Sequence, residues 1–171
     1  LDMATGVMST ETLTGATPAA FSAHAADRGD TEDILACQEA LKKEHGTRIA
    51  GEYGPEYDTG TMINRVEKDL QNMLKALAKS EDGFFLMYEE AYFDKHSHSN
   101  ELQNTFYAGL RFNQIIGCVM EFAFYHPETV VVITADHETG GLHDVGGELA
   151  YETGDHSAAD VPVFAWGIGA E

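Results

Sequence analysis

Apolar residues recur at steps of three and four positions in the middle of the chain. The repeat consists of Ile63, Val66, Leu70, Met73, Leu74 and Leu77. This spacing predicts an amphipathic helix with one buried face. The polar residues 80–83 end the helix, and the apolar run 84–88 follows. A short apolar run between turn residues is typical of a buried parallel strand.

The alternation of helix and strand continues towards the end of the chain. A second helix is predicted over 104–125, because His126 and Pro127 interrupt its pattern. The β-branched run 130–133 predicts a second strand, and the apolar run 161–166 predicts a third. Helices that alternate with strands indicate an α/β fold with a mostly parallel sheet.

The first sixty residues give weaker signals. Residues 7–9 are consistent with a further strand, and Thr17 followed by Pro18 predicts a helix with Thr17 as its N-cap. Residues 46–60 are rich in glycine, tyrosine and charge and show no period, so we expect a loop or a truncated excursion there. The two cysteines, Cys37 and Cys118, allow one bridge at most, and Cys118 lies in an apolar run that suits a buried thiol.

Length and charge narrow the classes of function. A chain of 171 residues with 43% apolar residues has room for one folded domain. Its net charge of −19, from 29 acidic and 10 basic residues, argues against nucleic acid or an anionic membrane surface as the main partner. Solubility or a salty habitat would explain much of this charge. No apolar run is long enough for a membrane span, and the opening residues lack a basic start and an apolar core, so we expect mid-domain sequence there.

Metal-binding residue types gather where the predicted strands end. Residues 89–98 follow the first strand, residues 134–141 follow the second, and His156 shortly precedes the third. Ligands of open α/β sheets bind beyond the carboxyl ends of the strands. The candidate donors at these ends are Glu89, Asp94, His98, Asp136, His137 and His156. Together they would be a costly cluster of like charge without cations, whereas carboxylates and imidazoles are zinc ligands and oxygens alone suit magnesium.

Each of these segments also has a purely structural interpretation. Residues 94–98 are compatible with a solvated helix start, and a single histidine such as His156 is more often packed than a metal ligand. The remaining histidines are expected at the surface or partly packed; they are His24, His45, His126 and His143. Three polar clusters at three strand ends are harder to explain without a site.

Four segments resemble the alkaline phosphatase family, in the order that the family has them. T-A-D-H-E-T-G-G-L at 134–142 is similar to the family signature, and Glu89-x4-Asp94-x3-His98 is similar to its second metal motif. Residues 154–165 resemble its late zinc-histidine segment, and A-T-P-A-A at 16–20, with His24 and Arg28, resembles the stretch that ends in its phosphate-binding arginine. The resemblance implies a three-layer α/β sandwich, with residues 1–171 as a partial catalytic domain and a shortened excursion at about 31–60.

The resemblance implies two zinc sites. One zinc ion would be held by Asp94, His98 and His156, and the second by Asp136 and His137. Two such ions can stabilise both the attacking and the leaving oxygen of an in-line displacement at phosphorus.

The resemblance also implies a magnesium site and a substrate. Glu89 and Thr17 would contribute to one magnesium site, Arg28 would clamp two phosphate oxygens, and Lys95 would reach the phosphate. The substrate would be a small phosphate monoester. The resemblance alone implies a periplasmic or secreted enzyme. It also implies a possible homodimer, since the family is commonly dimeric.

The chain also departs from the family pattern. We find no D-S-A turn that would carry the nucleophile, and Ser9, Ser22 and Ser97 do not lie in such a context. Residues 137–156 are also shorter than the corresponding family region, and Gly15 stands where the family often has aspartate or histidine. We therefore expect a fragment or truncated member that is a poor catalyst by itself. Alternatives are another member of the metal phosphatase and sulfatase superfamily, a metal-binding chain without turnover, and an acidic domain without a site.

Overall fold

The computed structural model describes residues 2–55 and 61–170, with no side-chain description for 61–64. The chain divides into two compact units, Leu1–Ala91 and Tyr92–Glu171.

The first unit is built on a parallel sheet of three strands. They are β1 (Ala4–Ser9), β2 (Arg48–Ala50) and β3 (Phe84–Glu89), in the order β2-β1-β3. Met8 of β1 lies beside Ala50 on one side and Tyr88 on the other. The parallel strand expected at 84–88 is confirmed, and the one at 7–9 is longer than expected. The expectation of a loop over 46–60 is wrong for 48–50, which form β2; residues 56–60 lie outside the described residues.

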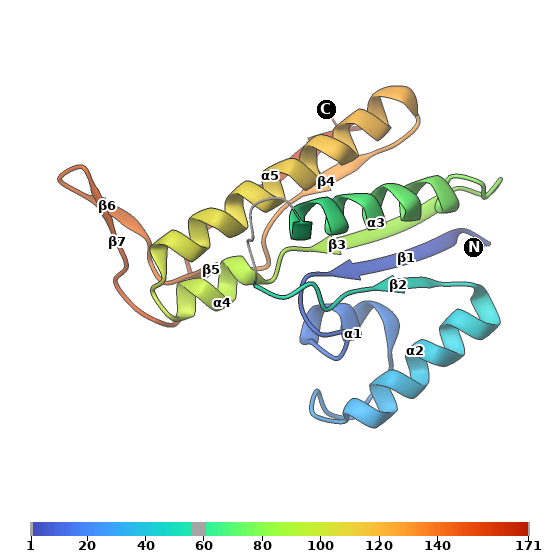
Figure 1. Cartoon of the computed structure of the whole chain (residues 1–171), viewed down its shortest axis with the longest axis horizontal. Coiled ribbons are helices and arrows are strands. Elements are labelled where there is room, and N and C mark those ends of the chain that lie inside the picture. The colour runs from blue at the N-terminus through green and yellow to red at the C-terminus, as the bar shows by residue number, and fades with distance from the viewer. Residues whose placement is uncertain (1, 56–60, 171) are drawn as a thin grey trace. The chain divides into compact units, whose positions relative to one another are not determined.

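Helices lie on both sides of this sheet. Figure 1 shows α3 (Thr61–Leu77) on one side and α1 (Ala16–Ser22) and α2 (Thr31–His45) on the other. The predicted apolar face contributes to the core, since Val66 and Leu70 are fully buried. α3 approaches β1 closely at Gly6, where an added Cβ would lie 2.9 Å from the Leu77 side chain. The three layers expected for an α/β sandwich are therefore present within this unit.

Helix α1 begins two residues earlier than predicted. Its N-cap is Gly15 rather than Thr17, and no side chain caps it. Pro18 is thus the third helical residue, and it is buried. Proline fits there because the first N–H groups of a helix have no intrahelical acceptor, so a proline anywhere in the first turn costs no hydrogen bond.

A buried phenol ties the segment after β2 to α3. Tyr53 donates a hydrogen bond to Asp69 Oδ2 at 3.0 Å and is 3% exposed. Burial first, and then the hydrogen bond to the Asp69 carboxylate, raise the pKa of Tyr53 well above its ordinary value. The phenol therefore stays a neutral hydrogen-bond donor at pH values where a free tyrosine would begin to ionise.

In the described part of the second unit, two helices are accompanied by three short strand pairs. Helix α4 (Tyr92–His98) packs on α5 (Leu102–Tyr125), with Phe93 edge-on to Phe112 at 5.9 Å. The strand pairs are antiparallel; they are β4 (Val131–Ile133) with β9 (Phe164–Trp166), β5 (Glu138–Thr139) with β8 (His156–Ser157), and β6 (His143–Val145) with β7 (Glu148–Ala150). The strand expected at 161–166 is thus confirmed only in its second half.

Two expectations about thiols and membranes can be compared with the structure. Neither Cys37 nor Cys118 is in a disulfide bond. Both side chains are half-buried, so Cys118 is less buried than expected. Within the described ranges, none of the helices has the length and apolar character needed to cross a bilayer.

We predict that Leu70→Ala lowers the free energy of unfolding of the first unit by about 2–5 kcal/mol, because it leaves a cavity under α3. Leu35→Ala is the matched control in the same unit, since Leu35 lies on α2 and is 46% exposed. Urea unfolding followed by circular dichroism measures both. Equal losses of stability for the two variants would contradict the packing described here.

Candidate metal centre

Helix α4 brings Asp94 and His98 onto one face. Residues four positions apart on a helix are neighbours, and here His98 Nε2 lies 3.2 Å from Asp94 Oδ1. Both side chains are about two-fifths exposed. The helix therefore presents one oxygen and one nitrogen donor side by side, open to solvent.

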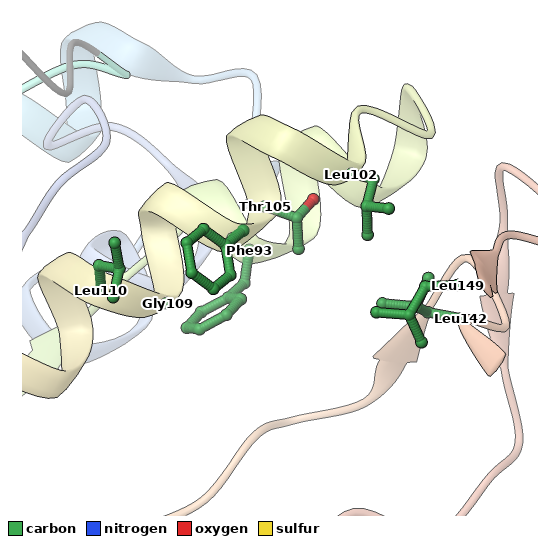
Figure 2. Close-up of a pocket in the computed structure, with 8 residues that line it drawn as sticks. Phe93, Leu102, Thr105, Gly109, Leu110, Leu142 and Leu149 are labelled. Atoms are coloured by element: carbon green, nitrogen blue, oxygen red, sulfur yellow. The ribbon is translucent and has the colours of Figure 1, made fainter. Parts of the chain in front are cut away.

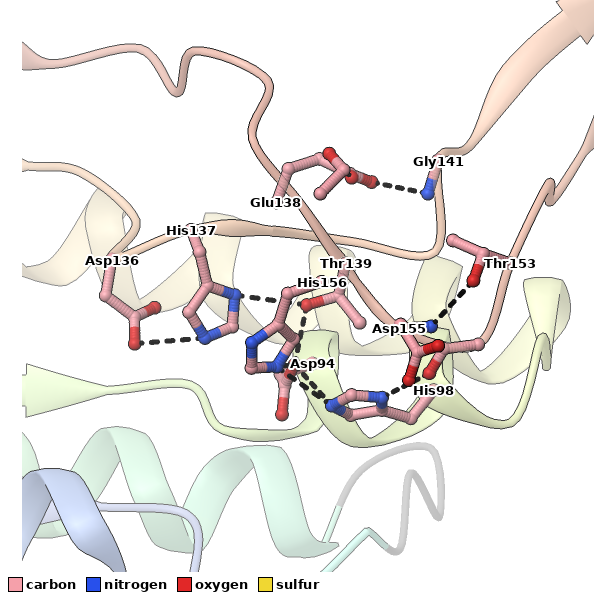
Figure 3. Close-up of polar contacts among 12 residues, drawn as sticks. Asp94, His98, Asp136, His137, Glu138, Thr139, Gly141, Thr153, Asp155 and His156 are labelled. Atoms are coloured by element: carbon pink, nitrogen blue, oxygen red, sulfur yellow. Dashed lines mark hydrogen bonds and ion pairs between the residues drawn. The ribbon is translucent and has the colours of Figure 1, made fainter.

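The pairing of β5 with β8 adds His156 to this face. In the register, Thr139 lies opposite His156 and Glu138 lies opposite Ser157. The Ser157 hydroxyl donates to the Glu138 carboxylate, which reinforces a pairing only two residues long. His156 Nε2 then lies 3.0 Å from His98 Nε2 and 3.4 Å from Asp94 Oδ1 (Figure 3).

The ring of His98 is held by a backbone carbonyl. His98 Nδ1 donates a hydrogen bond to the Gly154 carbonyl at 2.5 Å. A neutral imidazole carries one N–H, so Nε2 presents a lone pair towards the carboxylate oxygen of Asp94 and the ring nitrogen of His156. Gly154 suits this close approach, because an added Cβ would lie 2.9 Å from the carbonyl oxygen of His98.

The contacts of a neutral His98 ring suit a bound cation. A carboxylate oxygen only accepts hydrogen bonds, so it repels an unprotonated ring nitrogen at 3.2 Å. A cation bound by all three atoms removes the repulsion. Metal-ligating histidines typically donate their other ring N–H to a carbonyl or carboxylate, and His98 has this arrangement.

Asp136 and His137 form a second pair of possible metal ligands, and a hydrogen bond again orients the imidazole ring. His137 Nε2 lies 3.3 Å from Asp136 Oδ2, and His137 Nδ1 lies 3.2 Å from Thr139 Oγ1. Thr139 Oγ1 donates its only proton to Asp94 Oδ1, at 2.6 Å. The hydroxyl can therefore only accept from His137, so Nδ1 carries the N–H and Nε2 of the neutral ring faces the Asp136 carboxylate as a lone pair.

The two sets of donors are adjacent. One ligand atom from each of Asp94, His137 and His156 lies within 4.8 Å of the other two, and the rings of His137 and His156 stack with centroids 3.6 Å apart. Imidazole nitrogens with carboxylate oxygens are the donors of zinc sites in proteins. The residues present therefore fit zinc better than magnesium or calcium, which take oxygen ligands.

Other side chains of α4 point to different partners. His96 Nδ1 bonds Glu101 Oε2 at 2.8 Å, and the Lys95 ammonium lies over the Tyr92 ring, 5.9 Å from its centroid. Hydrogen bonds from Asn104 and then from His96 lower the pKa of Glu101 below its ordinary value. The helical period thus separates His98, in the cluster, from His96, which bonds Glu101 at the N-cap of α5.

The remaining site residues predicted from the sequence belong to the first compact unit. That they act in the same site as the cluster stays a prediction. Glu89, at the end of β3, accepts a hydrogen bond from Ser9 at 2.5 Å. Thr17 is half-buried in α1, and Arg28 is exposed in the turn between α1 and α2. A Cβ added at Gly15 would lie 2.8 Å from Glu11 Oε2, so the Glu11 carboxylate takes the space that a side chain at position 15 would need.

The three serines considered as nucleophiles are all buried. Ser9 donates to Glu89 and is 0% exposed, and Ser22 donates to the Pro18 carbonyl and is 1% exposed. Ser97 is 7% exposed, with its Oγ 3.5 Å from the Tyr151 hydroxyl. A nucleophile must reach the substrate, so this burial agrees with their rejection from sequence context.

A hollow elsewhere in the second unit has no chemistry of its own. It has a volume of about 290 Å³ and lies between α4, α5 and the β6–β7 segment (Figure 2). Its lining is apolar except for one threonine and consists of Phe93, Leu102, Thr105, Phe106, Gly109, Leu110, Leu142 and Leu149. Since it has no titratable side chain, the polar cluster is the better candidate for a reaction site.

Two residues of the centre were not assigned from the sequence. Thr139 lies two positions after His137, so on an extended strand the two side chains share a face, and this spacing could have suggested it. Gly154 acts through its backbone carbonyl, which the sequence pattern does not reveal.

Comparison with known proteins shows the relationship of the chain. Residues 61–151 match the family model for alkaline phosphatase. Alkaline phosphatase 3 of Bacillus subtilis (strain 168) is 38% identical over 85 residues, which cover 49% of this chain and 18% of that protein. The repressible alkaline phosphatase of Saccharomyces cerevisiae is 36% identical over 89 residues, which cover 52% of this chain and 14% of that protein. The chain thus spans less than a fifth of the length of these two relatives.

Solved structures show the same fold. The alkaline phosphatase of the Antarctic bacterium TAB5 has a TM-score of 0.81 and 24% identity, over 99% of this chain and 66% of that chain. A cold-active alkaline phosphatase from Shewanella sp. has a TM-score of 0.83 and 21% identity, over 98% of this chain and 70% of that chain. The family model covers more than half of the chain and includes α4, β5 and most of the donors in the cluster. The chain therefore belongs to the alkaline phosphatase family.

Proposed function

We propose that this chain provides most of a centre for the hydrolysis of phosphate monoesters that uses two zinc ions and one magnesium ion. Family membership supports the reaction class, and the donor geometry of the second unit supports the zinc ions. The observation that carries the proposal is the orientation of His98. Its N–H is donated to the Gly154 carbonyl, so Nε2 of the neutral ring turns its lone pair towards Asp94 and His156, which is the form in which a histidine binds a metal.

In this proposal each zinc ion has its own ligands from the chain. Asp94, His98 and His156 hold one ion, and Asp136 and His137 hold the other. When bound, the two ions supply Lewis acidity at the attacking and leaving oxygens of the phosphoryl group. They also reverse the local field of a chain whose net charge of −19 would otherwise repel a phosphate.

The other assigned residues bind and orient. Arg28 clamps two phosphate oxygens through its planar fork of N–H donors, and Lys95 supplies a second positive charge. Glu89 and Thr17 contribute oxygens to magnesium, which prefers such ligands. A variant of the TAB5 alkaline phosphatase has been solved with Mg bound in its M3 site, which supports a magnesium site in this family. An exported location and a homodimer are inferred from the family alone.

We predict that zinc stabilises the chain through these ligands. Zinc at about 100 times its Kd should raise the free energy of unfolding by about 2.7 kcal/mol, because the ligands converge only in the folded state. Thermal melting with zinc, and again after EDTA, measures the effect. His98→Gln should remove most of it.

His143→Gln is the matched control for this experiment. His143 Nδ1 also bonds a carbonyl, that of Gly141 at 2.9 Å, and its Nε2 lies 3.9 Å from Glu152, but it stands outside the cluster. This variant should respond to zinc as the unaltered chain does. A melting temperature that zinc and EDTA leave unchanged in the unaltered chain would refute the metal centre.

We predict that the zinc-loaded chain binds inorganic phosphate more tightly than sulfate, and that it hydrolyses p-nitrophenyl phosphate slowly because Ser9, Ser22 and Ser97 are buried. Calorimetry with phosphate and sulfate tests the substrate class, and absorbance at alkaline pH tests turnover. Tighter binding of sulfate would favour the sulfatase alternative. Fast turnover that EDTA abolishes would show that a nucleophile had been overlooked.

A further inference from the structure

We propose that Thr139 is a positioning residue that links the two zinc-ligand sets and selects the metal-binding tautomer of His137. The inference rests on the proposed function, since it concerns the same centre. Its basis is one hydroxyl group that contacts a ligand from each set, Asp94 at 2.6 Å and His137 at 3.2 Å. Figure 3 shows Thr139 between these two side chains.

The direction of the two hydrogen bonds follows from proton count. A threonine hydroxyl has one proton and two lone pairs, whereas a carboxylate has no proton to give. The proton of Thr139 therefore goes to Asp94, and the oxygen accepts the N–H of His137 Nδ1. This arrangement leaves Nε2 of the neutral His137 ring unprotonated, which is the form that binds a metal.

Without the hydroxyl, His137 has a competing partner. Asp136 Oδ2 lies 3.3 Å from His137 Nε2 and is a good acceptor for an N–H at that position. The other neutral tautomer, with its proton on Nε2, would then be stabilised by Asp136, and the lone pair needed for zinc would be lost. Thr139 thus opposes a hydrogen bond that would compete with the second zinc ion.

The same hydroxyl couples the two ligand sets. A zinc ion on Asp94, His98 and His156 fixes the Asp94 carboxylate, and Asp94 fixes the direction of the Thr139 proton. That direction in turn sets the tautomer of His137. Binding of the first ion should therefore favour binding of the second, and this coupling is reciprocal by thermodynamic linkage.

Two variants separate the hydroxyl from the shape of the side chain. Thr139→Val keeps the branched shape on β5 but removes the hydroxyl, and Thr139→Ser keeps the hydroxyl. Thr134→Val is the matched control, because among the described residues the Thr134 hydroxyl bonds backbone carbonyls, those of Ala135 at 3.1 Å and Pro162 at 3.3 Å. All three are compared with the unaltered chain.

The first measurement needs no metal. Nitrogen-15 NMR of the neutral imidazoles in the metal-free chain should find His137 protonated on Nδ1 in the unaltered chain, in Thr139→Ser and in Thr134→Val. In Thr139→Val it should find the proton shifted to Nε2. An unchanged Nδ1–H tautomer in Thr139→Val would overturn the proposal.

The second measurement is a zinc titration against a competing chelator. Thr139→Val should lower the affinity for the second zinc ion by about 10–100-fold, as is typical when a hydrogen-bond partner of a metal ligand is lost. Thr139→Ser and Thr134→Val should bind zinc as the unaltered chain does. Unchanged zinc affinities in Thr139→Val would overturn the proposal. A weaker affinity for zinc would also overturn it if the metal-free Thr139→Val melted at a correspondingly lower temperature than the metal-free unaltered chain, since that would show a merely structural role.

Failure of the metal centre and failure of this inference have different signatures. An unaltered chain that binds no zinc would refute the proposed centre, and the tautomer comparison would still decide the role of Thr139. An unaltered chain that binds two zinc ions, with Thr139→Val indistinguishable from it, would refute the role of Thr139 alone.

Discussion

The whole proposed centre depends on the orientation of two imidazole rings, each of which is held by a hydrogen bond from its far side. His98 faces Asp94 at 3.2 Å and His137 faces Asp136 at 3.3 Å, and in each case the ring N–H is held on the far side. A carbonyl holds it in the first case and a hydroxyl in the second. Lone pairs so close together repel unless a positive charge lies among them. The hydrogen bonds outside the cluster therefore orient both rings as the proposed cation site needs them.

The fold produces this constraint with very local devices. One turn of α4 sets the spacing of Asp94 and His98, and the two-residue pairing of β5 with β8 sets the place of His156. Ser157 and Glu138 strengthen that pairing from the opposite position of the same register. All of these residues lie within one compact unit, so the first ligand set does not depend on residues of the other.

The sequence predicted the elements with strong periodicity and the donors with diagnostic spacing. The helix rich in Val66 and Leu70 and the four-residue spacing of Asp94 and His98 follow directly from the helical repeat. The three-residue strand β2 was missed because a strand so short inside a glycine-rich stretch has no detectable period. The role of Thr139 was missed for a different reason, since it depends on where one proton points, and residue type alone does not give that direction.

The same reasoning about proton direction clarifies the first unit. Ser9 donates its proton to Glu89, while its oxygen accepts the Glu11 N–H at 3.1 Å. Both hydrogen-bonding roles of a fully buried hydroxyl are thus used, which leaves Ser9 unsuited to attack phosphorus. A carboxylate has about four lone-pair sites, so the contact with Ser9 orients Glu89 without exhausting it. Ser9 therefore bears the same relation to Glu89 that Thr139 bears to Asp94. In both units a hydroxyl fixes a carboxylate that is proposed to hold a metal, and catalysis by that hydroxyl is not required.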